Sequence, residues 1–283
     1  MINKLPSYIS IASIIFILAA EKVFAHEGEE EEIETALVPT LEDTIRANSI
    51  KVVIIGSILI LLVVILTVLF KDKGEGVKKL IFAGIAAPVL AVTIFLVSAT
   101  VYLNTISSSG GPVHWHADFE IWDCGQKLEL VDPQGISNRV GSATFHEHND
   151  DRIHVEGVVV NKDEASLERF FRFIGGRLHM DGFEIPTNEG LIVKNNNDLC
   201  SDKKPGKLQV FVYKIVNATT NQNSNFVYKQ EKLTDFTDYI LSPYGNVPPG
   251  DCVIVEFSQE KEKTDKLCGS YKLQQMKGKL YGD

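Results

Sequence analysis

The stretch PVHWHADFEIW, residues 112–122, decides how the carboxyl-terminal part of this 283-residue chain is expected to fold. Polar and apolar residues alternate along it. Successive side chains of a β-strand point to opposite faces, so this pattern predicts a strand with one face toward a hydrophobic core. The polar face would carry His114, His116, Asp118 and Glu120, and the apolar face Trp115, Ala117, Phe119 and Ile121.

Two later segments repeat the alternation. In ATFHEH (143–148) His146 and His148 share one face, and Phe145 lies on the other. In RIHVEGVVV (152–160) Arg152, His154 and Glu156 lie opposite Ile153 and Val155. The turn NDD between the two segments makes them a predicted hairpin. In all three strands the histidines lie opposite the core-forming residues, although the register between strands stays open.

The rest of this region contains further strands and one helix. SLERFFRFIGG (166–176) has a capping Ser166, an apolar stripe and a terminating glycine, which predict a helix. LHMDGFEI (178–185) predicts a tight hairpin about Asp181-Gly182, and residues 207–216 and 251–258 predict strands. We therefore expect an α+β domain that is mostly antiparallel β with one short helix.

Two longer apolar segments precede this domain. Residues 52–70 and 80–103 carry no charge, and each approaches the roughly 20 residues that cross a bilayer as a helix. The loop between them, KDKGEGVKK (71–79), contains four lysines. Short basic loops stay cytoplasmic, so a two-pass hairpin (50–103) with both flanks on the extracytoplasmic side of the cell membrane is predicted.

The remaining segments complete the predicted organisation. Residues 1–25 have a lysine, an apolar run and small residues in the order of a secretory signal peptide, with an uncleaved anchor as the alternative. Residues 26–49 form an acidic extracytoplasmic arm and 104–111 a flexible linker. The final 172 residues, 112–283, suit a single histidine-rich domain with its own core.

All four cysteines fall in this domain. They are Cys124, Cys200, Cys252 and Cys268. An even number of cysteines in an exported domain, without a Cys-x-x-Cys pair, favours two disulfides over metal thiolates. The sequence leaves the three possible pairings open.

The histidine segments also carry a family resemblance. The series His114-x-His116-Ala117, His146-x-His148, Ile153-His154-Val155-Glu156 and Phe170-Phe171-x-x-Ile174-Gly175, with PPGDCVIVEF at 248–257, resembles a family of small exported histidine-rich domains of bacteria and archaea. Its members read approximately HxHA, HTHD, IHVE and FFxxWG. The resemblance covers about residues 112–258 and implies one domain but no established activity. This chain departs from the pattern at Asn149, in a shorter turn before Ile153, and at Ile174.

The histidines predict a transition-metal site. Imidazole is the commonest neutral metal ligand in proteins, and two histidines at i and i+2 of a strand project the same way. We take His114, His116, His146 and His148 as the ligands, His154 as a fifth, and Glu120 and Glu156 as further ligands or as partners that orient the rings. Copper or zinc suits such a set best, and iron is possible. His179 lies outside the cluster.

Two other functions compete with metal binding alone. HWHADFE matches the His-x-His-x3-Glu spacing of the first cupin metal motif, which would make the protein a metal-dependent enzyme, although the cupin glycines and second motif are missing. Alternatively, the histidines form a structural or pH-responsive surface for membrane interaction without metal. The formal charge of -9 argues against nucleic acid as a partner and leaves lipid and metal.

Overall fold

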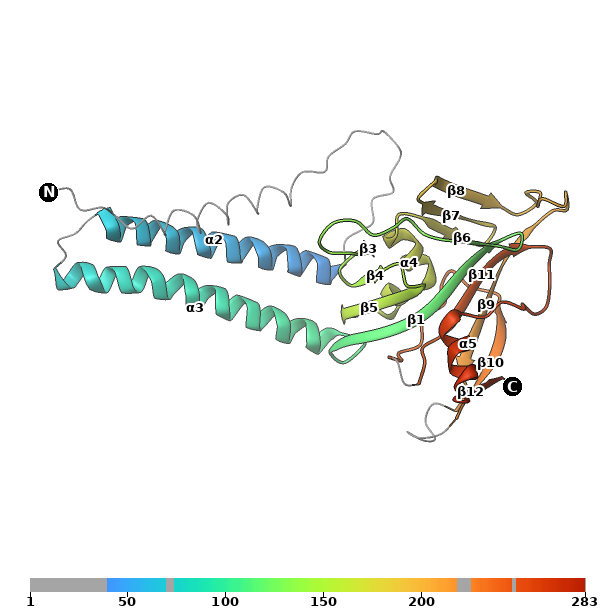
Figure 1. The fold of residues 1–283 in the computed structure, drawn as a ribbon. Helices are drawn as coiled ribbons and strands as arrows, with labels where there is room; N and C mark the ends of the chain where they lie inside the picture. Colours follow the sequence, from blue (N-terminus) through green and yellow to red (C-terminus); the bar gives the residue numbers. More distant parts are fainter. Residues whose placement is uncertain (1–39, 70–73, 218–224, 246–247, 283) are drawn as a thin grey trace. The chain divides into compact units, whose positions relative to one another are not determined.

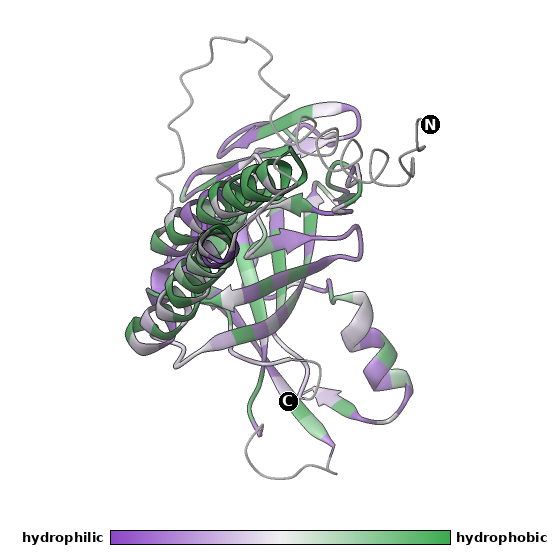
Figure 2. Ribbon diagram, turned by 90° about the vertical axis from the view of Figure 1, so that its left-hand side faces the viewer, coloured by the Kyte–Doolittle hydropathy of each residue, from purple (hydrophilic) through white to green (hydrophobic). Residues whose placement is uncertain are grey.

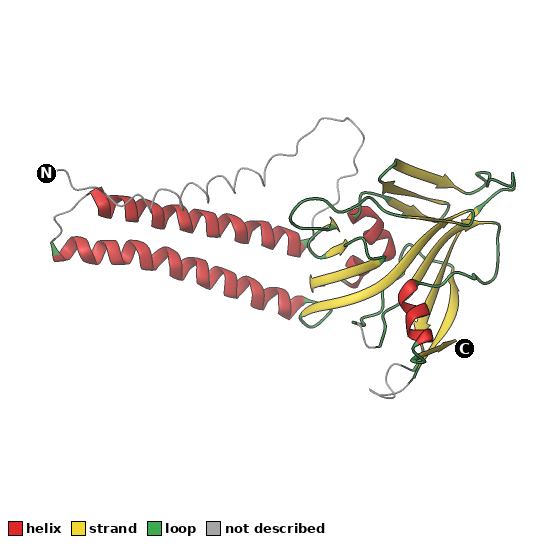
Figure 3. Ribbon diagram, in the orientation of Figure 1, coloured by secondary structure: helices red, strands yellow, loops and turns green. Residues whose placement is uncertain are grey.

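The computed structural model describes residues 40–69, 74–217, 225–245 and 248–282. The predicted signal peptide (1–25) and the first part of the predicted acidic arm (26–39) lie outside the described residues. The chain is a mixed α+β protein, mostly β, in which two long helices precede a β-rich domain (Figures 1 and 3).

The two long helices are α2 (Leu41–Leu69) and α3 (Glu75–Ile106). Both are long and apolar enough to cross a membrane, and Figure 2 shows them mostly green, the colour of hydrophobic residues. Helix α2 begins inside the predicted arm because Thr40 caps it: the backbone N–H of Asp43 donates to Thr40 Oγ1 at 3.0 Å, and the Asp43 carboxylate accepts from the Thr40 N–H at 3.1 Å. Helix α3 likewise begins inside the predicted loop 71–79.

Helices α2 and α3 contact each other through small residues. A Cβ atom placed on Gly56 would lie 2.7 Å from Val92 Cγ2, and one on Gly84 would lie 3.2 Å from Val63 Cγ2. Glycine at these positions lets the two backbones approach closely, which is typical of helix pairs in lipid. Many large apolar side chains of both helices, such as Leu80 and Phe82, remain exposed in the described structure.

The segment between α3 and the domain is tied to it by hydrogen bonds. The backbone N–H of Ser108 donates to the carbonyls of Val159 and Val160 at 3.1 and 3.0 Å. The Gly111 N–H donates to Ser107 Oγ at 2.9 Å. Part of the stretch assigned to a flexible linker is therefore fixed by backbone contacts.

A large twisted sheet dominates the described part of the domain. Its strand order is β12-β10-β9-β11-β1-β5-β4-β3, and β2 pairs with β1 beside this path. Strand β1 pairs in parallel with β11 and antiparallel with β5. The strands are β1 (Pro112–Asp123), β2 (Gln126–Leu128), β3 (Val140–Gly141), β4 (Phe145–Glu147), β5 (Arg152–Val158), β9 (Lys207–Ile215), β10 (Phe226–Leu233), β11 (Cys252–Ser258) and β12 (Leu280–Gly282).

Smaller elements complete the domain. A second sheet has the order β6-β7-β8, with β6 (Arg177–His179), β7 (Gly182–Thr187) and β8 (Gly190–Asn195). The predicted helix is α4 (Leu167–Phe173), preceded by the 3-10 helix η1 (Lys162–Ala165), and the Ser166 hydroxyl accepts from the Arg169 N–H as expected of an N-cap. A further short helix, α5 (Gly269–Met276), was not predicted from the sequence.

Side chains of the large sheet belong to two hydrophobic clusters. The larger contains Ala117, Phe119 and Ile121 of β1 together with the aromatic side chains of α4. The smaller is built from β9, β11 and α5, and Trp122 of β1 packs against it. Neighbouring residues of β1 thus contribute to different clusters, as the alternation predicts.

The four cysteines form two disulfides. Cys124 pairs with Cys200 across 76 residues, and Cys252 pairs with Cys268 across 16. The second bridge ties the start of α5 to β11. The expectation of two disulfides is confirmed, and the structure selects one of the three pairings.

Candidate metal centre

The candidate metal centre lies on the face of β1, β5 and β4 that is turned away from the larger hydrophobic cluster. Val113, Trp115 and Ala117 of β1 pack into or against that cluster. His114 and His116 alternate with them and therefore project from the opposite face.

Strand register brings histidines of three strands into one row. His116 of β1 is directly opposite His154 of β5, and His154 is directly opposite His146 of β4. Side chains opposite each other in antiparallel pairs lie on the same face with Cβ atoms about 4.5–5.5 Å apart. Two residues before His116, on the same face of β1, His114 pairs with Glu156 of β5. The three imidazoles of the row are thereby neighbours by backbone pairing alone.

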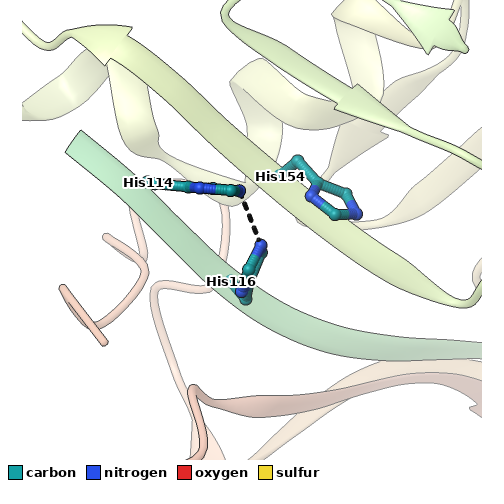
Figure 4. A group of neighbouring side chains, drawn as sticks. All are labelled: His114, His116 and His154. Carbon is teal, nitrogen blue, oxygen red and sulfur yellow. Dashed lines mark hydrogen bonds between the residues drawn. The ribbon is translucent and has the colours of Figure 1, made fainter. Parts of the chain in front are cut away.

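One group of three histidines consists of His114, His116 and His154, with one ligand atom from each within 4.8 Å of the others. Figure 4 shows these rings converging from β1 and β5. The Nε2 atoms of His114 and His116 are 3.0 Å apart, as in a hydrogen bond in which one ring N–H donates to the other nitrogen. Two nitrogens bound to one zinc ion at 2.0–2.1 Å would be separated by about 3.3 Å. The pair needs little movement to chelate an ion.

A second group consists of His146, His148 and His154, again within 4.8 Å of one another. The His146 ring stacks on His154 at a centroid distance of 5.4 Å, and His148 meets both rings edge-on at 4.7 and 4.9 Å. His148 Nδ1 hydrogen-bonds to the backbone carbonyl of Asn138. Because the carbonyl can only accept, Nδ1 carries the proton and Nε2 of His148 keeps the free lone pair.

Two nitrogens of the cluster lack a protein partner. His146 Nδ1 and His154 Nδ1 are buried and have no hydrogen-bond partner among the described residues. An unsatisfied buried polar atom costs about 1–3 kcal/mol, so each is a position at which a bound ion would stabilise the fold.

Burial keeps the inner rings neutral. The pKa of His146 is lowered to about 4, mainly by desolvation and to a smaller extent by His148 and His154, against the opposing effect of the Glu156 carboxylate. Desolvation also lowers the pKa of His154, against the opposing effect of Asp150. A metal binds the neutral ring, so these shifts favour ligation at neutral pH.

Two carboxylates lie beside the rings. Glu156 Oε1 is 3.0 Å from His114 Nε2, and Asp150 Oδ2 is 3.5 Å from His154 Nε2. Of the acidic residues in the turn, Asp151 instead pairs with Lys127. The Asn149 side-chain amide donates to Asp132 Oδ1 at 3.1 Å. Asp150 is therefore the turn carboxylate that faces the histidines.

Glu120 lies apart from both histidine groups. Its carboxylate accepts a hydrogen bond from Trp122 Nε1 at 2.9 Å and is 3.9 Å from Lys272 Nζ of α5. Asp118, between it and the histidines, pairs with Arg152 at 2.7 Å. The structure thus brings together six of the predicted residues, namely His114, His116, His146, His148, His154 and Glu156, and places Glu120 beneath α5.

Sequence reasoning missed the contribution of the Asn138 carbonyl. This residue lies in an irregular loop and has a φ of 45°, a left-handed conformation in which asparagine is enriched. A backbone carbonyl leaves no side-chain pattern, so no motif could have identified it. His179 of β6 is exposed and belongs to neither group.

The donor set consists of imidazole nitrogens with flanking carboxylates. All four cysteines are in disulfides, so no thiolate is available to the site. Such nitrogen and oxygen donors suit divalent transition metals. Comparison of the chain with protein-family models, with curated proteins and with solved structures found no match.

Proposed function

We propose that this protein is a membrane-anchored extracytoplasmic protein that binds a divalent transition metal through histidines of β1, β4 and β5. The observation that supports it most is the register His116–His154–His146, which juxtaposes imidazoles from three strands. Five of the seven histidines of the chain belong to the two groups around this row.

Copper(II) or zinc is the proposed ion, with iron as a further candidate. Neutral imidazole suits these metals, whereas magnesium and calcium prefer all-oxygen sites. Glu156 is proposed as an additional ligand or as the partner that orients His114, because it already lies 3.0 Å from that ring.

The extracytoplasmic location rests on two features. Disulfides form and persist in oxidising compartments, and this domain has two. The lysine-rich segment between the apolar helices favours a cytoplasmic turn, which leaves the domain outside. Protease added to intact cells should digest the domain, and protection of the domain until the cells are lysed would refute this orientation.

Metal binding is tested on the full chain in detergent micelles. After chelation, re-addition of zinc or copper and gel filtration, elemental analysis should find bound metal in the wild type. The variant His116→Ala with His148→Ala removes one ligand from each group and should lose it. His179→Ala is the matched control and should bind as the wild type does.

The fold of each variant is checked separately. Trp115 and Trp122 are the only tryptophans of the chain and both belong to β1, so their fluorescence reports the β domain alone. Unchanged metal content in the double variant would refute the assignment of these ligands.

A further inference from the structure

The two histidine groups share one residue. His154 belongs to both, whereas His114 and His116 belong only to the first and His146 and His148 only to the second. Resting on the proposed metal-binding function, we propose that His154 bridges two metal ions through its two ring nitrogens. One ion would be held with His114 and His116, and the other with His146 and His148.

The position of His154 in the sheet suits a bridge. Strand β5 lies between β1 and β4, and His154 is paired directly with a histidine on each side. Its ring centroid is 4.7 Å from that of His116, 6.4 Å from His114, 5.4 Å from His146 and 4.9 Å from His148. The other four rings thus form two pairs beside it, one from β1 and one made of His146 of β4 and His148, which directly follows that strand.

Both ring nitrogens of His154 are suited to ligation. In Figure 4 one of them is turned toward His114 and His116, and the other is turned away from that pair. Nδ1 is buried without a hydrogen-bond partner among the described residues. Nε2 has the Asp150 carboxylate at 3.5 Å, a long contact for a hydrogen bond. A nitrogen lone pair binds one ion, so a residue shared by two sites must use both nitrogens.

The proton released by a bridging His154 is accounted for, and groups beside the ring offset part of the charge of the two ions. A neutral imidazole has one free lone pair, so the first ion binds without loss of a ring proton. The second ion takes the remaining nitrogen, and the N–H proton of that nitrogen is released to solvent. The resulting imidazolate, together with the carboxylates of Glu156 and Asp150, offsets part of the charge of two divalent ions.

Bridging has a spectroscopic consequence that separate sites lack. With metal–nitrogen bonds of about 2 Å on each side of the ring, the two ions would be about 6 Å apart. Two copper(II) ions joined by an imidazolate couple their unpaired electrons antiferromagnetically through the ring. They therefore contribute little to the electron paramagnetic resonance signal at low temperature.

The experiment loads the full chain in detergent with copper(II) sulfate and compares total bound copper with the copper seen by electron paramagnetic resonance. The wild type should bind two ions per chain, with most of the signal lost as the second ion binds. His154→Gln cannot bridge, and its signal should account for all the copper that it retains. His179→Gln should behave as the wild type.

A variant that leaves His154 intact makes the test independent of that substitution. His148→Ala with His146→Ala should reduce binding to one ion per chain with full signal intensity. Two bound ions with full signal in the wild type, or one ion per chain at saturation, would overturn the bridge while leaving metal binding intact. Absence of bound copper and zinc would overturn the proposed function itself.

Discussion

His146 provides a quantitative test of how deeply the cluster is buried. The side chain is 2% exposed, and desolvation lowers its pKa from 6.5 to about 4. In the unfolded chain the ring would take up a proton near pH 6.5, whereas in the folded metal-free protein it would do so only near pH 4. The unfolded state therefore binds more protons between these values, and stability falls as the pH is lowered through this window.

The size of the effect follows from the shift. One pKa unit corresponds to about 1.4 kcal/mol, so the stability contributed by the neutral ring of His146 should decrease by at most about 3 kcal/mol between pH 7 and pH 4. Replacement by phenylalanine removes the titrating group and keeps an aromatic ring beside His154. The His146→Phe variant should therefore lose this part of the acid sensitivity.

The assay is urea unfolding of the metal-free full chain in detergent, followed by tryptophan fluorescence at pH 7, 5.5 and 4. The difference in unfolding free energy between wild type and His146→Phe should change with pH, to the disadvantage of the wild type in acid. His179→Phe, at an exposed position, should track the wild type. Parallel pH profiles for wild type and His146→Phe would refute the argument that a buried neutral imidazole occupies this position.

Three further predictions concern the metal, the disulfide that closes the shorter loop, and the pair of helices α2 and α3. Zinc at 100 times its dissociation constant should raise the unfolding free energy of the domain by about 2.7 kcal/mol for each ion bound, and the gain should vanish in the variant His116→Ala with His148→Ala. Replacing Cys252 and Cys268 by serine opens a loop of 16 residues and should cost about 3 kcal/mol in urea unfolding, with an unchanged midpoint counting against the bridge. Because a Cβ on Gly84 would lie 3.2 Å from Val63, cysteines introduced at these two positions should cross-link under mild oxidation. Adding Gly56→Leu should reduce that cross-linking, since a Cβ at Gly56 already approaches Val92 to 2.7 Å, and equal cross-linking with and without Gly56→Leu would argue against this packing.

The alternation of polar and apolar residues made the local features of the domain predictable. From Val113 to Ile121 the apolar residues of β1 belong to the larger cluster or pack against it, because they share one face of the strand, and the two-residue period of the pattern identifies that face. Ser166 likewise predicted the start of α4, because its hydroxyl can accept a hydrogen bond from a backbone N–H of the first turn. Such features depend on neighbours within a few residues, which the sequence displays directly.

The register between strands and the burial of a residue by an element far away in the sequence could not be predicted in this way. The pairing of His116 with His154, and of His154 with His146, depends on the position of the turn at 149–151 and on strands that are far apart in the sequence. Glu120 illustrates the same limit. It shares a face with His114, yet it is 4% exposed because α5, about 150 residues later, places Lys272 over that end of β1. The sequence HWHADFE gives no indication that Lys272 of α5 lies over Glu120.

The resemblance to a family of exported histidine-rich domains stays a prediction, as do the boundaries of the signal peptide and arm. The disulfide pairing was open because four cysteines allow three connectivities and only the fold brings partners together. In this fold the Cα atoms of Cys124 and Cys200 are 5.5 Å apart, and those of Cys252 and Cys268 are 5.8 Å apart.

The most direct test of the metal centre is the anomalous X-ray scattering of crystals grown with zinc or copper. We expect metal density on the histidine face of β1, β5 and β4, within bonding distance, about 2.0–2.1 Å, of ring nitrogens from at least two of these strands. Metal density located elsewhere on the protein, with the rings of His116, His154 and His146 unliganded, would contradict it.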